Sequence, residues 1–264
     1  MKIGIIGLGN MGGAILGGLV EKGLVSAKEI YGYDVNSSLL ENVSVRYGIN
    51  KASGNEEVID KADAVILAVK PQFMAGMLES IKDKWNDDTV IISIAAGKTI
   101  EWLEQNIGKD KKIVRCMPNT PALVGEGCTG VCNNKNVEKK DLELALKLLT
   151  SCGKAIEVSE AQMDAVVGIS GSSPAYVFMF IEALADAGVA AGLTRDKAYE
   201  FAASAVKGSA ALMLETKKHP GELKDMVCSP AGTTIEAVKV LEEGGFRGLV
   251  MDAVEACVER NRQL

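Results

Sequence analysis

The sequence predicts an α/β part built on a doubly wound, mainly parallel sheet, followed by an all-α part. Over residues 1–160, short apolar stretches alternate with stretches of helical spacing, which is the pattern of parallel strands joined by crossover helices. Beyond residue 160 the β-branched stretches stop, and alanine, glycine and long apolar runs at helical spacing take their place. We therefore expect one domain at residues 1–160 and a second at residues 161–264.

The chain opens with a strand at residues 2–6, a glycine-rich turn and a helix at residues 14–21. In the turn, Gly7, Gly9 and Gly12 follow the G-x-G-x-x-G spacing of a dinucleotide site. The first glycine permits the tight turn, the second lets a pyrophosphate approach the backbone, and the third lets the helix pack on the strand. The phosphates would lie at the helix N-terminus, where free N–H groups favour negative charge. The expected cofactor contacts are Gly7, Leu8, Gly9, Asn10, Met11 and Gly12.

A second strand, residues 29–34, ends in Asp34. An acid at this position accepts from a ribose 2′-OH and repels a 2′-phosphate, which favours NADH. Asn36 follows two residues later, and Asn55 is expected to cap a short helix. Both asparagines are candidate contacts to the adenine-side ribose of either cofactor. The choice between NADPH and NADH stays open on these residues.

Three later strands, at residues 63–69, 90–97 and 112–117, are continuous apolar runs typical of a buried parallel sheet. Ligands of such sheets bind outside the carboxyl ends of the strands, so the strand exits are candidate cofactor contacts. Lys70 is a candidate phosphate contact, with an ordinary exposed lysine as the alternative. The predicted contacts at these exits are Ala68, Val69, Lys70, Pro71, Ala95 and Ala96.

The remainder of the chain is expected to supply two more strands and then helices alone. A turn-rich connection at residues 118–127 leads to strands at 128–132 and 155–158, with a helix at 139–151 between them. Ser172 or Ser173 with Pro174 is typical of a helix start. Helices are predicted at residues 174–191, 195–215, 222–227, from the stretch 229–234 through 241, and at 246–261. Helices this apolar are expected to hide faces against another subunit.

Composition argues against several other classes of protein. The net charge of −6, without a basic stripe, argues against nucleic-acid or membrane-surface binding. We find no apolar run near the ~20 residues that span a bilayer, and no signal peptide, so we expect a cytoplasmic location. The single histidine, His219, argues against histidine metal sites and histidine-based nucleophilic catalysis, so no metal is expected. Six cysteines without a C-x-x-C pair indicate reduced thiols.

Three stretches together resemble the pyrroline-5-carboxylate reductases of proline biosynthesis, in the order expected of that family. They are residues 6–12, residues 168–176 and, most specifically, residues 219–235; residues 68–71 and 117–121 are also similar. The resemblance implies hydride transfer from NADPH or NADH to 1-pyrroline-5-carboxylate, giving L-proline. It also implies an N-terminal Rossmann domain and an all-α C-terminal dimerisation domain. The family forms homodimers, commonly assembled into decamers.

Residues 229–234 combine a hydroxyl, small residues and a helix start, which is a ready anion site for a substrate carboxylate. A plain helix cap is the alternative reading of the same residues. By the resemblance, Thr234 is the catalytic residue that hydrogen-bonds the substrate, and Ser229, Gly232 and Thr233 are its substrate-binding neighbours. Glu160 is similar to a substrate-site glutamate of the family, with a solvated surface acid as the alternative.

Two other functions are weighed against this one. A 3-hydroxyacid dehydrogenase or related imine reductase shares the opening glycine turn, but the dehydrogenases need a catalytic lysine on the long interdomain helix, and residues 174–191 contain none. A non-catalytic NAD(P)-sensing regulator would bind the dinucleotide without turnover. Residues 229–234 would have no evident purpose in such a regulator.

Overall fold

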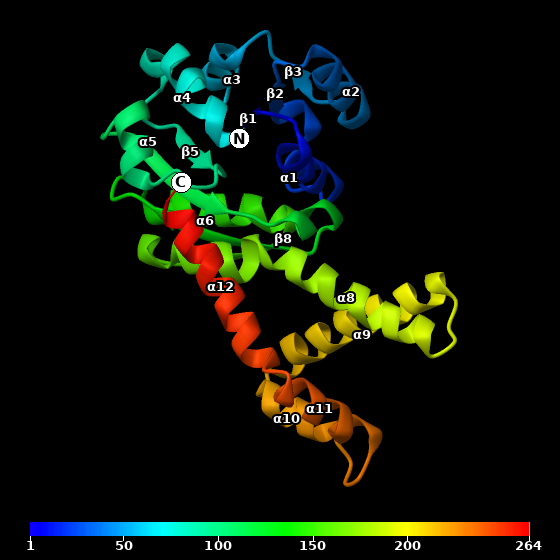
Figure 1. Ribbon diagram of the computed structural model, residues 1–264. Helices are drawn as coiled ribbons and strands as arrows, with labels where there is room; N and C mark the ends of the chain where they lie inside the picture. Colours follow the sequence, from blue (N-terminus) through cyan, green and yellow to red (C-terminus); the bar gives the residue numbers. More distant parts are fainter. Residues whose placement is uncertain (264) are drawn as a thin grey trace. The chain divides into compact units, whose positions relative to one another are not determined.

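The computed structural model describes residues 1–263, and its packing divides the chain into two units (Figure 1). The first comprises Met1–Ser172 and the chain from Val258 onward; the second comprises Ser173–Cys257. The division in packing therefore lies later than the expected boundary at residue 160. Residues just beyond 160 pack on the sheet unit, because the Met163 side chain is fully buried in a cluster with Ile100 and Cys132.

The sheet unit is built on one eight-stranded sheet with the order β3-β2-β1-β4-β5-β6-β7-β8. All neighbours are parallel except β6 and β7, which run antiparallel. The strands are β1 (Ile3–Ile6), β2 (Ile30–Tyr33), β3 (Asn50–Lys51), β4 (Ala64–Leu67), β5 (Val90–Ser93), β6 (Lys112–Met117), β7 (Gly127–Asn133) and β8 (Gly153–Glu157). Within residues 1–263 no strand follows β8, so the predicted change of character after the last strand is confirmed.

Strand order reverses at β1, which lies between β2 and β4. The four strands around this point end at one level, because Ile6 is opposite both Tyr33 and Leu67, and Leu67 is opposite Ser93. The segments that follow these strands therefore meet along one edge of the sheet. In doubly wound sheets this edge is where ligands bind.

Helices cover both faces of the sheet, which explains the continuous apolar strands. Ile3 and Ile5 of β1 face one cluster with Leu16 and Leu148, whereas Ile6 faces the other. The helices of this unit are α1 (Asn10–Glu21), α2 (Ser37–Tyr47), α3 (Asn55–Lys61), α4 (Pro71–Ser80), α5 (Ile100–Ile107), α6 (Lys139–Leu149) and α7 (Met163–Val166). A π-helical turn, Val167–Gly171, follows α7.

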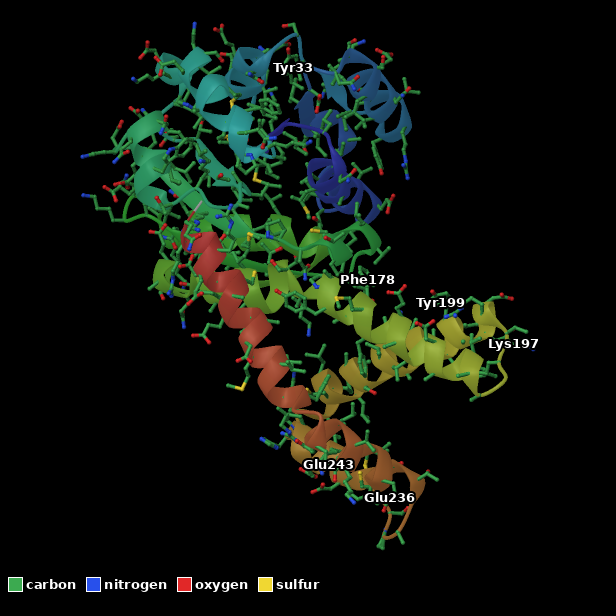
Figure 2. The ribbon with its side chains drawn as sticks, in the orientation of Figure 1. Tyr33, Phe178, Lys197, Tyr199, Glu236 and Glu243 are labelled. Carbon is green, nitrogen blue, oxygen red and sulfur yellow. The ribbon has the colours of Figure 1, made fainter. Side chains whose placement is uncertain are left out.

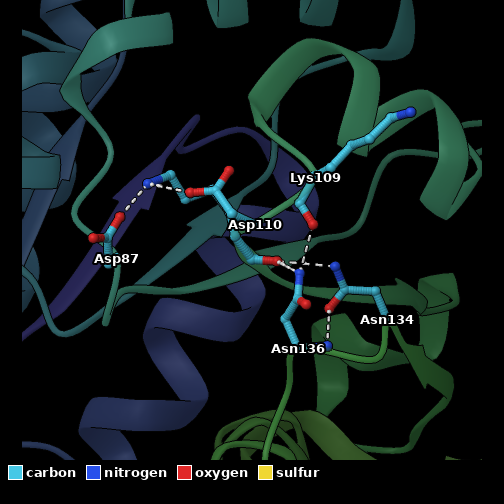
Figure 3. A network of polar contacts seen from close by, with 6 residues as sticks. Asp87, Lys109, Asp110, Asn134 and Asn136 are labelled. Atoms are coloured by element: carbon cyan, nitrogen blue, oxygen red, sulfur yellow. Dashed lines mark hydrogen bonds and ion pairs between the residues drawn. The ribbon is translucent and has the colours of Figure 1, made fainter.

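A polar network holds the turn that leads from α5 into β6 (Figure 3). Asn134, which is 5% exposed, accepts from the Ile113 N–H at 3.2 Å and donates to the Lys111 carbonyl at 2.9 Å. Asn136 donates to the carbonyls of Lys109 and Lys111, at 2.7 and 2.9 Å. These amides replace the ladder bonds that the chain lacks where β7 turns away from β6. They therefore fix the start of β6.

The second unit is helical and contains the hairpin of α8 (Ser173–Ala190) and α9 (Arg195–Thr216), which lie side by side (Figure 1). Small residues permit this close contact, since Ala185, Ala198 and Ala202 are buried between the two helices. The helices that follow are α10 (Pro220–Met226), α11 (Thr233–Glu243) and α12 (Phe246–Arg262). The end of α12 belongs to the first unit, where Asn261 donates to Asp164 at 2.9 Å.

The helical unit exposes large apolar side chains. Phe178 on α8 is 63% exposed and Met251 on α12 is 72% exposed, and Phe178 projects from its helix (Figure 2). The helical run from Glu160 to Ala190, 31 residues, contains an 18-residue window with a mean hydropathy of 1.3, which is enough by length and composition to cross a membrane. The expectation that no such run exists was therefore wrong. It overlooked that few charged residues interrupt the helical segments on either side of Ser172.

One predicted helix start was also wrong. Gly54, not Asn55, is the N-cap of α3, because Glu57 reaches back to the Ser53 N–H at 2.8 Å and fixes the start one residue earlier. The helix predicted to open at Ser172 or Ser173 with Pro174 does begin there, since α8 starts at Ser173. The Ser172 N–H donates to the Val167 carbonyl at 2.8 Å and closes the preceding π-helical turn.

Candidate functional site

Backbone surrounds two of the three glycines in the opening turn, and the third faces open space. Gly7 has φ +93°, and a Cβ there would lie 2.6 Å from the Ala68 carbonyl oxygen. A Cβ on Gly12 would lie 2.1 Å from the Gly7 carbonyl oxygen, but one on Gly9 would meet nothing within 4 Å. The first and third glycines are therefore required for packing. The second leaves room at the N-terminus of α1, as expected for a pyrophosphate.

A cavity of about 560 Å³ opens beside this turn. Two of the side chains that line it are apolar yet exposed, Val35 at 89% and Phe73 at 61%. Such side chains suit the flat apolar faces of an adenine ring. The cavity brings together these predicted residues from the exits of β1, β2 and β4 and the start of α3: Gly7, Gly9, Asp34, Asn55, Ala68, Val69 and Lys70.

Asp34 holds the backbone of the turn. Its Oδ2 accepts from the Leu8 N–H at 2.7 Å, and its Oδ1 accepts from the Asn36 N–H at 2.9 Å. A carboxylate has about four acceptor positions, so the same group retains capacity for a ribose hydroxyl. Asp34 therefore ties the exit of β2 to the glycine turn at the edge of the 560 Å³ cavity.

The two candidate asparagines differ in their environment. Asn36 is the N-cap of α2, where its Oδ1 accepts from the Leu39 N–H at 3.1 Å. Asn55 lines the cavity, and its Oδ1 is buried without a hydrogen-bond partner in the protein. A buried acceptor of this kind is normally satisfied. Asn55 is thus the asparagine that is poised for a ligand.

A second cavity, of about 540 Å³, continues along the exits of β4, β5 and β6. It shares Gly9, Ala68, Val69 and Lys70 with the first. The remaining predicted contacts that line it are Asn10, Met11, Pro71, Ala95 and Ala96. The two cavities form one elongated crevice along the strand exits, as a two-part nucleotide requires.

An ion pair that the sequence did not reveal lies near the end of β6. Arg115, only 7% exposed, donates to Glu160 Oε1 at 2.9 Å, and the same oxygen accepts from the Ile100 N–H at 2.7 Å. Glu160 is therefore paired rather than freely solvated. Burial raises the pKa of the adjacent Cys132 thiol to about 11 and that of Cys116 well above its usual range. The signal in the sequence that could have indicated this ion pair was an arginine within an apolar strand.

A hydrogen-bonded junction joins two of the stretches that resemble known reductases. Asn119 donates to the Ser170 carbonyl at 3.1 Å and accepts from the Cys128 N–H at 2.8 Å. The Ser170 hydroxyl in turn donates to the Cys128 carbonyl at 3.1 Å. The connection after β6 and the π-helical turn after α7 therefore hold each other in place.

The loop of residues 229–234 leads into α11, within the helical unit. Gly232 is the N-cap and has no side chain that could accept a hydrogen bond. The first N–H groups of the helix therefore have no capping acceptor from this residue and can donate to a ligand. Ala231 has φ +58°, in the left-handed region that favours glycine. Thr233 and Thr234 form the exposed first turn. This is the helix start expected for a small anion.

The fold and the crevice define the class of protein as an NAD(P)H-dependent oxidoreductase with a helical dimerisation domain. Residues 2–97 match the family model described as NADP oxidoreductase, coenzyme F420-dependent. Residues 160–264 match the model described as pyrroline-5-carboxylate reductase dimerisation.

Full-length relatives identify the family. The pyrroline-5-carboxylate reductase of Escherichia coli (strain K12) is 50% identical over 263 residues, covering 100% of this chain and 98% of the relative. The chain belongs to the pyrroline-5-carboxylate reductases. A solved reductase from Coxiella burnetii is 36% identical with a TM-score of 0.94, covering 99% of this chain and 97% of that one. The Plasmodium falciparum pyrroline carboxylate reductase with NADP bound is 36% identical with a TM-score of 0.87, covering 100% and 97%.

Proposed function

We propose that the chain reduces 1-pyrroline-5-carboxylate to L-proline, with NADH or NADPH as the reductant. The observation that carries the proposal is the two-part crevice at the strand exits, on a chain that belongs to this reductase family. The crevice fits the cofactor, because Gly9 leaves space where a phosphate belongs and Asn55 keeps a buried acceptor for a ribose hydroxyl.

Each half of the crevice has its own task toward the cofactor, which supplies the hydride when it is bound. The glycine turn and the first N–H groups of α1 would hold the pyrophosphate. Val35 and Phe73 would flank the adenine, and Lys70 would add a positive charge near the phosphates. Ala95 and Ala96, after β5, would line the nicotinamide half. Small side chains there leave room for a substrate ring.

The substrate would be held by the loop of residues 229–234. Its carboxylate would accept from the first N–H groups of α11, with Ser229, Gly232 and Thr233 around it, and the Thr234 hydroxyl would hydrogen-bond the imine substrate. A cyclic imine can arrive already protonated from solvent, which makes its carbon electrophilic without a strong protein acid. Positioning of the two reactants then supplies much of the rate increase.

The division of labour follows the two predicted domains. Residues 1–160 would bind the cofactor, and residues 161–264 would bind the substrate and form the homodimer. Glu160, the last residue of the first predicted domain, would contact the substrate through Oε2, because its two hydrogen bonds within the sheet unit both use Oε1. Assembly of dimers into a decamer, a cytoplasmic location and the lack of nucleic-acid or membrane partners stay predictions.

The alternative functions have less support. A hydroxyacid dehydrogenase of the related group needs a lysine on its long helix, and α8 has none among Ser173–Ala190. A regulator without turnover would need no anion-binding helix start in the helical unit.

An assay with the purified chain tests the proposal. With 1-pyrroline-5-carboxylate, the chain should oxidise NADH or NADPH and release an equal amount of proline. Omission of the imine is the control for slow oxidation of the cofactor. Absence of proline with either cofactor would contradict the reductase function.

A further inference from the structure

A third cavity adjoins the first, the 560 Å³ cavity beside the glycine turn, at the exit of β2. It has a volume of about 430 Å³ and shares Tyr33, Asp34 and Val35 with the first. In sites of this type the acid that ends the strand bonds the ribose 2′-OH. The group at the 2′ position, a hydroxyl in NADH and a phosphate in NADPH, is therefore recognised where the two cavities meet.

Carboxylates outnumber cations among the residues that line this third cavity. Asp34, Glu41 and Glu57 contribute three negative charges, and Lys51 contributes one positive charge, which gives −2. The Lys51 ammonium is already in an ion pair with Glu41. The N–H and the hydroxyl of Ser53 both donate to Glu57 Oε2, at 2.8 and 2.6 Å, and these bonds lower the pKa of Glu57. The Lys51 ammonium and the Ser53 hydroxyl are thus both engaged by carboxylates.

The start of α2 acts in the opposite direction but is weaker. Ser37, its first residue, also lines the cavity. A helix N-terminus is equivalent to about half a positive charge, which does not offset a side-chain balance of −2. A phosphate monoester with about −1.5 to −2 charges at pH 7 is therefore repelled from this place.

We propose that this chain selects NADH over NADPH, and that Glu41 and Glu57 set the selection together with Asp34. The inference rests on the proposed reductase function, for which it names the reductant. Asp34 has a second role as a positioning residue, because it holds the Leu8 N–H of the glycine turn for either cofactor. Glu41 and Glu57 are separate from that turn and act through charge.

Titration calorimetry of NAD⁺ and NADP⁺ on the full chain, without substrate, measures this selection directly. We expect NAD⁺ to bind at least about tenfold more tightly, from the Coulomb energy of a phosphate near two uncompensated charges. Glu57→Gln removes a charge but retains a single oxygen that can accept both bonds from Ser53. Glu41→Gln removes a charge and releases Lys51. Each should tighten NADP⁺ by about threefold to tenfold and change NAD⁺ by less than about twofold.

Glu143→Gln on α6 is the matched control, because Glu143 is an exposed acid that does not line any of these three cavities. It should leave both affinities unchanged. Raising the salt from about 0.05 to about 0.5 M should narrow the ratio between the cofactors, since screening weakens repulsion. Thermal unfolding of each variant checks that its fold is intact.

Equal or tighter binding of NADP⁺ by the unmodified chain overturns the proposal. So does a parallel change for both cofactors in Glu41→Gln and Glu57→Gln, or a ratio that is independent of salt. Cofactor binding without reduction of the imine contradicts the proposed function and leaves the selection intact. Proline formation with NADPH as the better reductant supports the proposed function and overturns the selection of NADH.

Discussion

The two units of the molecule bury their apolar residues to very different degrees. In the sheet unit, side chains such as Ile5 and Ile66 are fully buried in large clusters. The buried cluster of the helical unit is formed by three alanines of α8 and α9, whereas Phe178 and Met251 are mostly exposed. The sheet unit therefore completes its core within one chain. The helical unit leaves apolar surface that another subunit could cover, in accord with its match to the pyrroline-5-carboxylate reductase dimerisation family.

The same contrast extends to the two candidate binding segments. Backbone packed around Gly7 and Gly12 fixes the glycine turn, and Asp34 ties it down by hydrogen bonds. The loop of residues 229–234 is exposed and contains Ala231 in the left-handed region. Changes in the first segment should thus affect folding or cofactor binding strongly. Changes in the second should affect the imine substrate, with small effects on stability.

The largest effect is expected in the glycine turn, where two substitutions separate packing from binding. Gly12→Ala places a Cβ 2.1 Å from the Gly7 carbonyl and should lower the free energy of unfolding by about 2–3 kcal/mol. Gly9→Ala meets no protein atom within 4 Å, so its stability should change by less than about 0.5 kcal/mol. Its cofactor affinity should still fall about 100-fold, because the methyl group occupies the phosphate space. Urea unfolding measures the stability, and titration calorimetry measures the cofactor affinity. If Gly9→Ala binds the cofactor as tightly as the wild type, the phosphate does not bind at this turn.

Breaking the half-buried ion pair of the sheet unit should also be costly. Arg115→Met removes a charge-assisted hydrogen bond to Glu160 and should lower the free energy of unfolding by about 2 kcal/mol. Glu160→Gln is the milder partner variant, since one amide oxygen can accept both bonds that now reach Oε1. We expect a loss of about 1 kcal/mol for it in the same urea experiment. Equal losses for the two variants would assign the stabilisation to the hydrogen bonds and not to the charge.

In the helical unit, Thr234→Ala should act on the substrate alone. Loss of one hydrogen bond to a charged substrate should lower kcat/KM for the imine about tenfold to 100-fold, with an unchanged cofactor Kd. Thr216→Ala is the control, because that hydroxyl donates to the Leu212 carbonyl within α9. Equal losses for imine and cofactor would place Thr234 in a structural role.

The smallest effect is expected at Ala231. Its φ of +58° costs an alanine about 1–2 kcal/mol, while a glycine loses about 0.5–1 kcal/mol more backbone entropy on folding. Ala231→Gly should therefore stabilise the chain by about 0.5 kcal/mol. Thermal unfolding at one protein concentration detects this, since the stability of a dimer depends on concentration. A lower melting temperature would show that the loop does not strain this residue.

Local patterns in the sequence were sufficient for much of the fold. Continuous apolar strands and the spacing of Gly7, Gly9 and Gly12 predicted the sheet and its binding edge. The antiparallel direction of β7 was not predicted, because an apolar stretch such as residues 128–132 carries no sign of its pairing partner. The π-helical turn before Ser172 was missed because serine and proline are also typical of a new helix start.

The site was harder to predict wherever partners are distant in the sequence. Arg115 meets Glu160 45 residues later, and Asn119 meets Ser170 51 residues later. Such pairs depend on strand order and register, which no local spacing contains. For Asp34, the sequence predicted its place at the strand end. Its bond to Leu8, across 26 residues, required the structure.

Because β1, β2, β4 and β5 end at the same level, insertions and deletions within these strands would disturb the cofactor edge. One inserted residue in any of these strands would shift its exit by about 3.3 Å, more than a hydrogen bond tolerates, and would turn its side chains to the opposite face. The loop between α8 and α9, residues 191–194, faces no such constraint. Insertions and deletions should therefore be excluded from the strands of the cofactor edge and accepted at the tip of the helical hairpin.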